Sequence, residues 1–252
     1  MLAGADPLMP SVFGFVPSPL NAAGAADMVL NEPPGGLRSV VTPNIQHVAL
    51  MRHDAAFAAA VREADVCLCD GFPVQLYARS RGVPLSERVA GREVVARIMA
   101  DPVRLRDHRL LALVDRQDVA DALDGWAAAN GLADRVLAVV APLGFGADAD
   151  AQAAFVETMR AFGPTIALLC LGAPTSELFL HRHRAALPPC WALCIGQSVK
   201  IVLGLVPTPP EAMVRLRLEW AWRIALEPRR MIARYVPAAW GFAAAVVRDR
   251  RR

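Results

Sequence analysis

The stretch RLLALVDRQDVADALDGWAAANGLADRVLAVVA, residues 109–141, decides the fold class of this chain. Its two ends, 109–114 and 135–141, are short apolar runs of the kind that form strands buried on both faces. A helical pattern at 118–130 lies between them. A strand, a helix and a second strand in this order predict a βαβ unit with two parallel strands.

The same alternation extends over most of the chain. Further predicted strands cover 37–42, 64–69, 165–171 and 191–195. Further predicted helices cover 54–63, with Asp54 as N-cap, 74–81, 93–99, 149–162 and 177–186. A short strand at 12–16 and a helix at 21–30 are expected before them. We therefore expect an α/β fold, a Rossmann-like mostly parallel sheet with helices on both faces, plus a C-terminal helical appendage.

Composition divides the chain into three parts. Residues 1–37 are an N-terminal segment rich in Pro, Gly and Ala that joins the core, and residues 38–205 form the Rossmann-like core. The run Val206-Pro-Thr-Pro-Pro210 is a stiff break. Residues 206–252 are an Arg- and Trp-rich helical appendage, in which Pro228 and Pro237 are expected to interrupt the helix.

The composition excludes a disordered chain, because 55% of the 252 residues are hydrophobic. The longest apolar runs, near 191–206 and 235–247, fall short of the roughly 18 uncharged residues that a spanning helix needs. No basic stretch precedes the apolar residues of the N-terminus, so no signal peptide is expected. A cytoplasmic location follows as an expectation.

The five cysteines are an odd number and lie in apolar runs, which predicts buried, reduced thiols. Cys190 and Cys194 have a spacing seen in zinc sites, but no second ligand pair lies nearby, so no metal site is expected. The five histidines follow no partner pattern and are expected in loops or at the surface.

Polar residues follow several of the predicted strands, where ligands of open parallel sheets bind. Asp70 ends the strand at 64–69 beside Gly71, and a carboxylate between apolar walls can serve as a general base. A simple Asp-Gly turn fits the same residues. Thr42 and Asn44 follow the strand at 37–42, where they can bind a ligand or cap the loop.

Several well-known site motifs are absent from the sequence. It holds no G-x-G-x-x-G after a strand and no G-x-x-x-x-G-K-[ST], which are the dinucleotide and P-loop fingerprints. It also lacks a G-x-S-x-G nucleophile elbow and an H-E-x-x-H zinc motif.

An ordered set of short motifs runs along the chain over about residues 38 to 236. They are Thr42 with Asn44, Asp70-Gly71, Glu87-Arg88 with Gly91 and Glu93, Gly172 with Pro174 and Glu177, Leu218-Glu219-Trp220 with Arg223, Glu227-Pro228 with Arg230, and Arg234-Tyr235. In its motifs and their order, the sequence resembles the WecG/TagA/CpsF glycosyltransferases.

The resemblance implies a bacterial enzyme of surface or exopolysaccharide synthesis. It would move a sugar from a UDP-sugar to a lipid-linked diphosphate saccharide, with inversion, and with no cofactor besides the donor. Asp70 would be the general base. The residues that would bind substrate are Thr42, Asn44, Gly71, Arg88, Gly91, Glu93, Gly172, Pro174, Ser176 and Glu177.

Arginines take the place of a metal in this interpretation, since no D-x-D motif follows a strand. Arg223, Arg230 and Arg234 would bind the diphosphate, because the planar guanidinium suits phosphate oxygens. Their offsets of 7 and 11 residues place all three near one helical face, although Pro228 is expected to interrupt that helix.

The chain departs from the family pattern at three places. This chain has Ser176 where the family pattern has Gln, and Val114-Asp115 where it has Gly-Gly. It has Thr208-Pro209-Pro210 where the pattern has Arg-Ala-Pro. These positions are expected to contact the donor or a phosphate. The alternative is therefore a non-catalytic, membrane-associated homologue that has lost donor binding.

The charge of the appendage suggests a membrane partner. The net charge of the chain is +3, but from Arg215 onward ten arginines stand against three acidic residues. Trp and Tyr side chains lie among them, as in helices at an anionic membrane surface. A solvated helix face fits the same pattern. No nucleic-acid-binding fold is recognisable, and the apolar composition is consistent with a homo-oligomer. We expect a peripheral protein on the inner face of the cell membrane.

Overall fold

The computed structural model of the chain describes residues 10–31, 35–85, 87–208, 210, 212–213 and 218–251. A six-stranded sheet in the order β2-β1-β6-β5-β3-β4 forms its centre, and every neighbouring pair is parallel. The strands are β1 Leu37–Val41, β2 Val66–Cys67, β3 Leu110–Val114, β4 Val136–Val140, β5 Ile166–Leu169 and β6 Cys190–Cys194. The predicted α/β class with a parallel sheet is confirmed.

Helices connect the strands and extend beyond them. The first six are α1 Ala22–Asn31, α2 Ile45–Leu50, α3 Ala55–Arg62, α4 Phe72–Ser80, α5 Gly91–Met99 and α6 Pro102–Leu105. The later ones are α7 Gln117–Ala129, α8 Ala149–Phe162, α9 Thr175–His183, α10 Ser198–Val202, α12 Glu219–Leu226 and α13 Pro228–Asp249. Among the described residues, no helix is both long and apolar enough to cross a bilayer.

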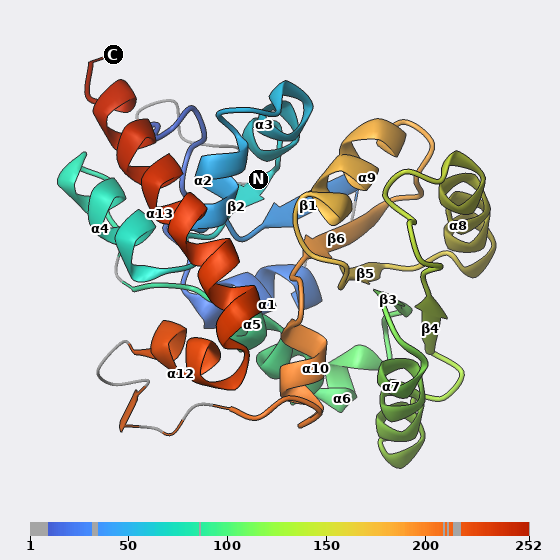
Figure 1. Cartoon of the computed structure of the whole chain (residues 1–252). Helices are drawn as coiled ribbons and strands as arrows, with labels where there is room; N and C mark the ends of the chain where they lie inside the picture. Colours follow the sequence, from blue (N-terminus) through green and yellow to red (C-terminus); the bar gives the residue numbers. More distant parts are fainter. Residues whose placement is uncertain are drawn as a thin grey trace.

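Helices cover both faces of the sheet (Figure 1). Successive side chains of the central strands point to opposite faces and are buried on both. In β3, Leu111 and Leu113 pack with residues of α3, α8 and α9, whereas Leu110 and Ala112 pack with residues of α1, α5 and α7. This two-sided burial explains why the strands read as continuous apolar runs in the sequence.

Two predicted local features are wrong. No strand forms at 12–16, because Gly14, at a φ of +86°, turns the chain back so that Val12 and Phe15 exchange backbone hydrogen bonds of 2.9 and 3.0 Å. Pro237 does not interrupt the last helix but lies inside α13. Pro228 opens that helix at its first turn, where a missing N–H is tolerated.

Helix α13 packs along α2, and α12 packs against α13 (Figure 1). Gly241 permits the close approach of the two helices, since a Cβ there would lie 2.5 Å from the Cβ of Ala49. Met231, Ala238 and Ala245 recur every seven residues on the buried side of α13. The appendage is thus fixed to the core rather than loosely attached.

Candidate active site

A cavity of about 830 Å³ opens beyond the carboxyl ends of β1 and β2. Its walls come from the start of α2, from α4, from the segment before α5 and the first turn of α5, and from α12 and α13. The charged residues that line it are Asp70, Glu87, Arg79, Arg88, Arg92, Arg223 and Arg234. Five cations against two carboxylates make this cavity suited to an anionic ligand.

Asp70 reaches the cavity because the chain continues beside β1 after the short strand β2. The backbone N–H of Leu68 donates to Val41 O at 2.9 Å, and that of Asp70 donates to Pro43 O at 3.0 Å. Gly71 then turns the chain into α4 with a φ of +90°, a conformation that side-chain-bearing residues rarely adopt. Asn44 follows β1, Asp70 and Gly71 follow β2, and all three residues line the cavity.

The carboxyl of Asp70 is held in a strongly perturbed environment. Burial raises its pKa above the ordinary value of 3.8, and this effect exceeds the opposing attraction of Arg88, Arg92, Arg223 and His47. The residue is nevertheless partly accessible from the cavity. A desolvated carboxylate ringed by cations has the basicity and the access that a general base needs.

The segment 87–93 contributes Glu87, Arg88 and Arg92 to the cavity lining, and Gly91 and Glu93 to its frame. Arg88 lines the cavity and forms an ion pair with Glu93 at 3.1 Å. Glu93 also accepts the N–H of Ala90 at 3.2 Å and so caps α5. Gly91 packs tightly, since a Cβ there would lie 3.0 Å from Ser198 Oγ.

Asn44 has a structural role as well as a place in the cavity. Its side chain caps α2 by accepting the N–H groups of Gln46 at 3.0 Å and His47 at 3.4 Å. His47 is buried, and its Nε2 lies 3.2 Å from Glu177 Oε1. The prediction that every histidine lies in a loop or at the surface is therefore wrong for His47, which links Glu177 to the wall of the cavity.

The polar residues beyond β5 and β6 do not line the cavity in this structure. Glu177 and Ser176 are buried, and Ser176 Oγ donates to Leu169 O at 3.4 Å. Thr42 is also buried and donates to Cys194 O at 3.4 Å. Gly172 turns with a φ of +79° just before the cis peptide bond that precedes Pro174.

The arginines of the appendage reach the cavity from two helices. Arg223 belongs to α12 and Arg234 to α13, and the chain breaks from helical geometry between them at Glu227. The expectation of a single helical face is therefore wrong, but both side chains line the cavity because the two helices fold together. The side chain of Arg230 lies outside the described part of the chain.

The cavity also contains residues that the sequence analysis did not single out as site residues. The polar ones are Gln46, Gln75, Arg79, Glu87 and Arg92, and Tyr235 adds an aromatic ring. Arg92 lies between Gly91 and Glu93, both of which were singled out, so its position in that motif was an available signal. Gln46 and Gln75 carry no such signal.

The five cysteines are buried and free, as predicted. Burial raises the pKa of every one of these thiols, which keeps them protonated. Within the described ranges, no group of three His, Cys, Asp or Glu side chains has a metal-binding arrangement.

Comparison with known proteins adds independent information. The model of the glycosyl transferase WecG/TagA/CpsF family matches residues 11–252 of this chain. The N-acetylglucosaminyldiphosphoundecaprenol N-acetyl-beta-D-mannosaminyltransferase of Bacillus spizizenii strain W23 is 24% identical over 204 residues, which are 79% of this chain and 77% of that protein. A protein of the same name from Bacillus subtilis strain 168 is 25% identical over 201 residues, 78% of this chain and 73% of its own length.

Proposed function

Since this chain belongs to the glycosyl transferase WecG/TagA/CpsF family, we propose that it transfers a sugar from a UDP-sugar to a lipid-linked diphosphate saccharide during bacterial surface or exopolysaccharide synthesis. The observation that carries the proposal is the carboxyl of Asp70, desolvated and surrounded by arginines at the edge of an 830 Å³ cavity. A cavity of this size holds a nucleotide-sized ligand.

Asp70 is the proposed general base of an inverting displacement. A hydroxyl oxygen of the acceptor attacks the anomeric carbon of the donor sugar while the bond from that carbon to the diphosphate oxygen breaks. Asp70 takes the hydroxyl proton, and UDP leaves with the bonding electron pair. The raised pKa of Asp70 makes its carboxylate a stronger base than an ordinary aspartate, so the rate should fall as Asp70 is protonated on acidification.

Arginines are the proposed electrophiles for the departing diphosphate. Arg223 and Arg234 line the cavity from the appendage, and Arg88 and Arg92 line it from the core. Guanidinium groups in a partly enclosed site stabilise developing charge without a metal ion. Transfer that persists in the presence of EDTA would support this reading, and transfer lost with EDTA and restored by Mg²⁺ or Mn²⁺ would refute it.

The rim of the cavity supports a lipid-linked acceptor at a membrane surface. Leu76 and Trp220 line the cavity and are 55% and 54% exposed, and Val236 lies with them. Trp240, one turn further along α13, is 76% exposed. Apolar and aromatic side chains around the mouth of a basic cavity fit an enzyme that docks on an anionic leaflet and receives its acceptor there.

The names of the two relatives suggest which substrates to try first. Both are named for transfer of N-acetylmannosamine to N-acetylglucosaminyldiphosphoundecaprenol. We propose an acceptor of this class, a saccharide joined through diphosphate to a polyprenol, and an N-acetylhexosamine or hexose donor.

Sugar transfer by the purified chain tests the proposal. The chain is given anionic vesicles, a panel of UDP-sugars led by UDP-N-acetylmannosamine, and a short lipid-diphosphate-N-acetylglucosamine acceptor, beside an Asp70→Asn variant. Transfer by the parent chain that the variant lacks supports the enzyme and its base together. Transfer that the variant retains keeps the enzyme but discards Asp70 as the base.

A second candidate is a membrane-associated homologue that has lost donor binding. Two departures from the family pattern favour it. Ser176 is buried and bonded to Leu169 O, and Asp115 forms an ion pair with Lys200 at 2.6 Å, so neither side chain is presented to the cavity. Calorimetry with UDP separates the two candidates, because this homologue would give no binding heat.

Point substitutions test the membrane contact. Removing α13 after Val236 would delete the buried Ala238 and Ala245 together with most of the packing on α2, so truncation would confuse folding with docking. Trp240→Gln and Val236→Gln leave the buried side of the helix intact. A smaller fraction of each variant than of the parent chain is expected to pellet with anionic vesicles. An unchanged fraction would contradict the proposed docking face.

A further inference from the structure

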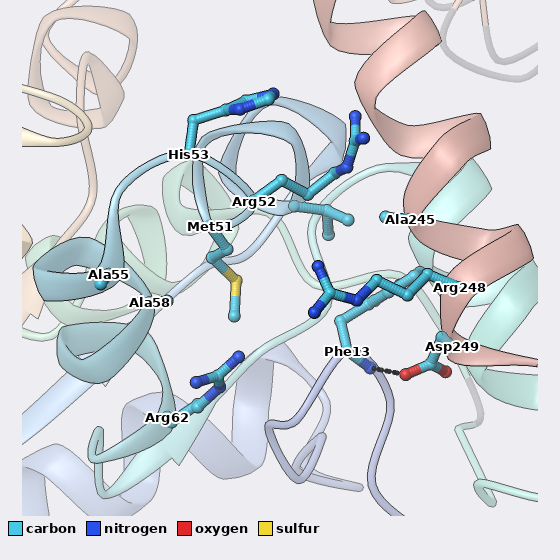
Figure 2. A pocket seen from close by; sticks show the side chains of 11 residues that line it. Phe13, Met51, Arg52, His53, Ala55, Ala58, Arg62, Ala245, Arg248 and Asp249 are labelled. Atoms are coloured by element: carbon cyan, nitrogen blue, oxygen red, sulfur yellow. Dashed lines mark hydrogen bonds between the residues drawn. The ribbon is translucent and has the colours of Figure 1, made fainter. Parts of the chain in front are cut away.

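A second cavity, of about 320 Å³, lies at the other end of α13. It shares no lining residue with the catalytic cavity. Figure 2 shows it between α2, α3, the last turns of α13 and the segment that carries Phe13. Arg234 and Arg248, one in each cavity, are fourteen residues apart on the same helix, a separation of about 21 Å at the usual rise.

Three guanidinium groups surround this second cavity. Arg52 follows α2, Arg62 ends α3 and Arg248 lies in the last turn of α13. In Figure 2, Arg62 and Arg248 point into the cavity on either side of the Met51 side chain. Arg52 donates to the carbonyl of Gly241 at 3.4 Å, and among the described residues its other N–H groups have no hydrogen-bond partner.

None of these three arginines forms an ion pair in the part of the chain that the structure describes. Asp249 is the carboxylate that lines the cavity, and both of its oxygens already accept hydrogen bonds. Oδ1 accepts the N–H of Phe13 at 2.9 Å, and Oδ2 accepts the hydroxyl of Tyr77 at 2.8 Å. Three cations and one carboxylate leave two positive charges of the lining uncompensated.

The floor of the cavity is apolar. Phe13, Val48 and Met51 are buried side chains that line it, beneath the three exposed arginines. Phe13 is itself fixed by stacking on Tyr77, with ring centroids 4.8 Å apart. The site therefore combines a rigid apolar base with a cationic rim.

We propose that this cavity binds a phosphate ester. Arg62 and Arg248 hold the phosphate oxygens, with Arg52 at the rim, because guanidinium forks match phosphate geometry and form charge-assisted hydrogen bonds. The carbon skeleton of the ester lies against Phe13, Val48 and Met51. The apolar floor favours a phosphate carried by a lipid headgroup, and a water-soluble phosphate presents the same chemistry. This cavity is separate from the proposed catalytic cavity, and ligand binding to it can be measured without an assay of sugar transfer.

Calorimetry on the full chain tests the site with two probes. One is dihexanoyl phosphatidylglycerol below its critical micelle concentration, and the other is inorganic phosphate. The test variant is Arg62→Gln/Arg248→Gln. The matched control is Arg250→Gln/Arg251→Gln, which removes the same charge from two exposed arginines next to the cavity that do not line it.

The parent chain is expected to bind the short phospholipid. Each lost charge-assisted contact weakens binding about tenfold, so the test variant should bind about 100-fold more weakly while the control stays within about threefold. Inorganic phosphate bound as tightly as the phospholipid, with the same dependence on Arg62 and Arg248, would support the site and identify its ligand as a water-soluble phosphate.

Two results would overturn the proposal. One is that the parent chain binds neither the phospholipid nor inorganic phosphate. The other is an equal loss in the test and control variants, which would reduce the effect to general charge. Melting curves check that the variants fold, and if the double variant does not, Arg62→Gln and Arg248→Gln are measured singly, each with an expected loss of about tenfold.

Discussion

The two halves of the carboxyl edge of the sheet carry similar sequence signals but differ in their surroundings. Beyond β1 and β2, Asn44 and Asp70 line a large basic cavity. Beyond β5 and β6, Glu177 and Ser176 are buried in contacts with the core. The two halves differ because α4, α12 and α13 enclose a cavity over the first half. A position at the end of a strand makes a residue a candidate for ligand binding. The helices around that strand end then determine whether a ligand can reach the side chain.

Of the substitutions that test this difference between the two halves, Asp70→Asn should have the largest effect on sugar transfer. Loss of the proposed base should lower the rate of sugar transfer by about 10²- to 10⁴-fold, as for general bases elsewhere.

The same substitution should raise the stability of the folded chain at pH 7. Because burial raises the pKa of Asp70, its ionised form destabilises the folded state at pH 7. The variant should therefore melt at a higher temperature at pH 7, and this gain should vanish below the ordinary pKa of 3.8.

Asp115→Asn is the matched control for that experiment, since Asp115 follows β3 in the other half of the edge. It should leave transfer within about threefold, because this carboxylate pairs with Lys200 and does not line the cavity. An equal loss in both aspartate variants would break the distinction between the two halves.

Arg234→Gln and Arg223→Gln test the contribution of the appendage to the covered half. Each removes a cation from the cavity wall, and each should lower the rate by about 10- to 100-fold through weaker stabilisation of the departing diphosphate. Arg229→Gln removes an exposed cation of α13 that does not line the cavity. Equal rates for all three variants would assign the effect to overall charge rather than to the cavity.

Gly241→Ala tests the packing that holds α13 over the covered half. The new Cβ would lie 2.5 Å from the Cβ of Ala49, so the helices must separate, at a cost of about 1–3 kcal/mol in the free energy of unfolding. Adding Ala49→Gly should recover much of that loss, because the methyl group then moves from one helix to the other. Urea unfolding of both variants measures this, and a failure of the double variant to recover would place the strain elsewhere.

The sequence predicted the sheet well because each central strand is buried on both faces and reads as an uninterrupted apolar run, as Leu110 to Val114 does. It also placed Asn44 and Asp70 directly after predicted strands, but it did not predict that these two strands are neighbours in the sheet. It could not predict that Arg223 and Arg234 reach the same cavity from separate helices, or that Gly241 allows α13 to pack on α2. Both depend on packing between segments nearly two hundred residues apart.

The His47–Glu177 pair offers the subtlest test, because it joins the two halves of the edge. His47 Nδ1 lies 3.4 Å from the backbone N of Asn44 and 3.1 Å from Asn44 Oδ1, and Nε2 lies 3.2 Å from Glu177 Oε1. A proton on Nε2 lets that nitrogen donate to the Glu177 carboxylate. The other oxygen of Glu177 has no hydrogen-bond partner within the described residues. Glu177→Gln keeps an acceptor for His47 but places a buried amide NH₂ where that oxygen was.

If Glu177 supports the cavity through His47, Glu177→Gln should lower the free energy of unfolding by about 1 kcal/mol and leave the dissociation constant for UDP within about threefold. If Glu177 instead contacts the donor, as its place in the motif predicts, UDP binding should weaken by about tenfold or more. Urea unfolding and calorimetry on the same variant decide between these outcomes. Weakened UDP binding with unchanged stability would show that the buried half of the edge opens to substrate, so that the two halves form a single site.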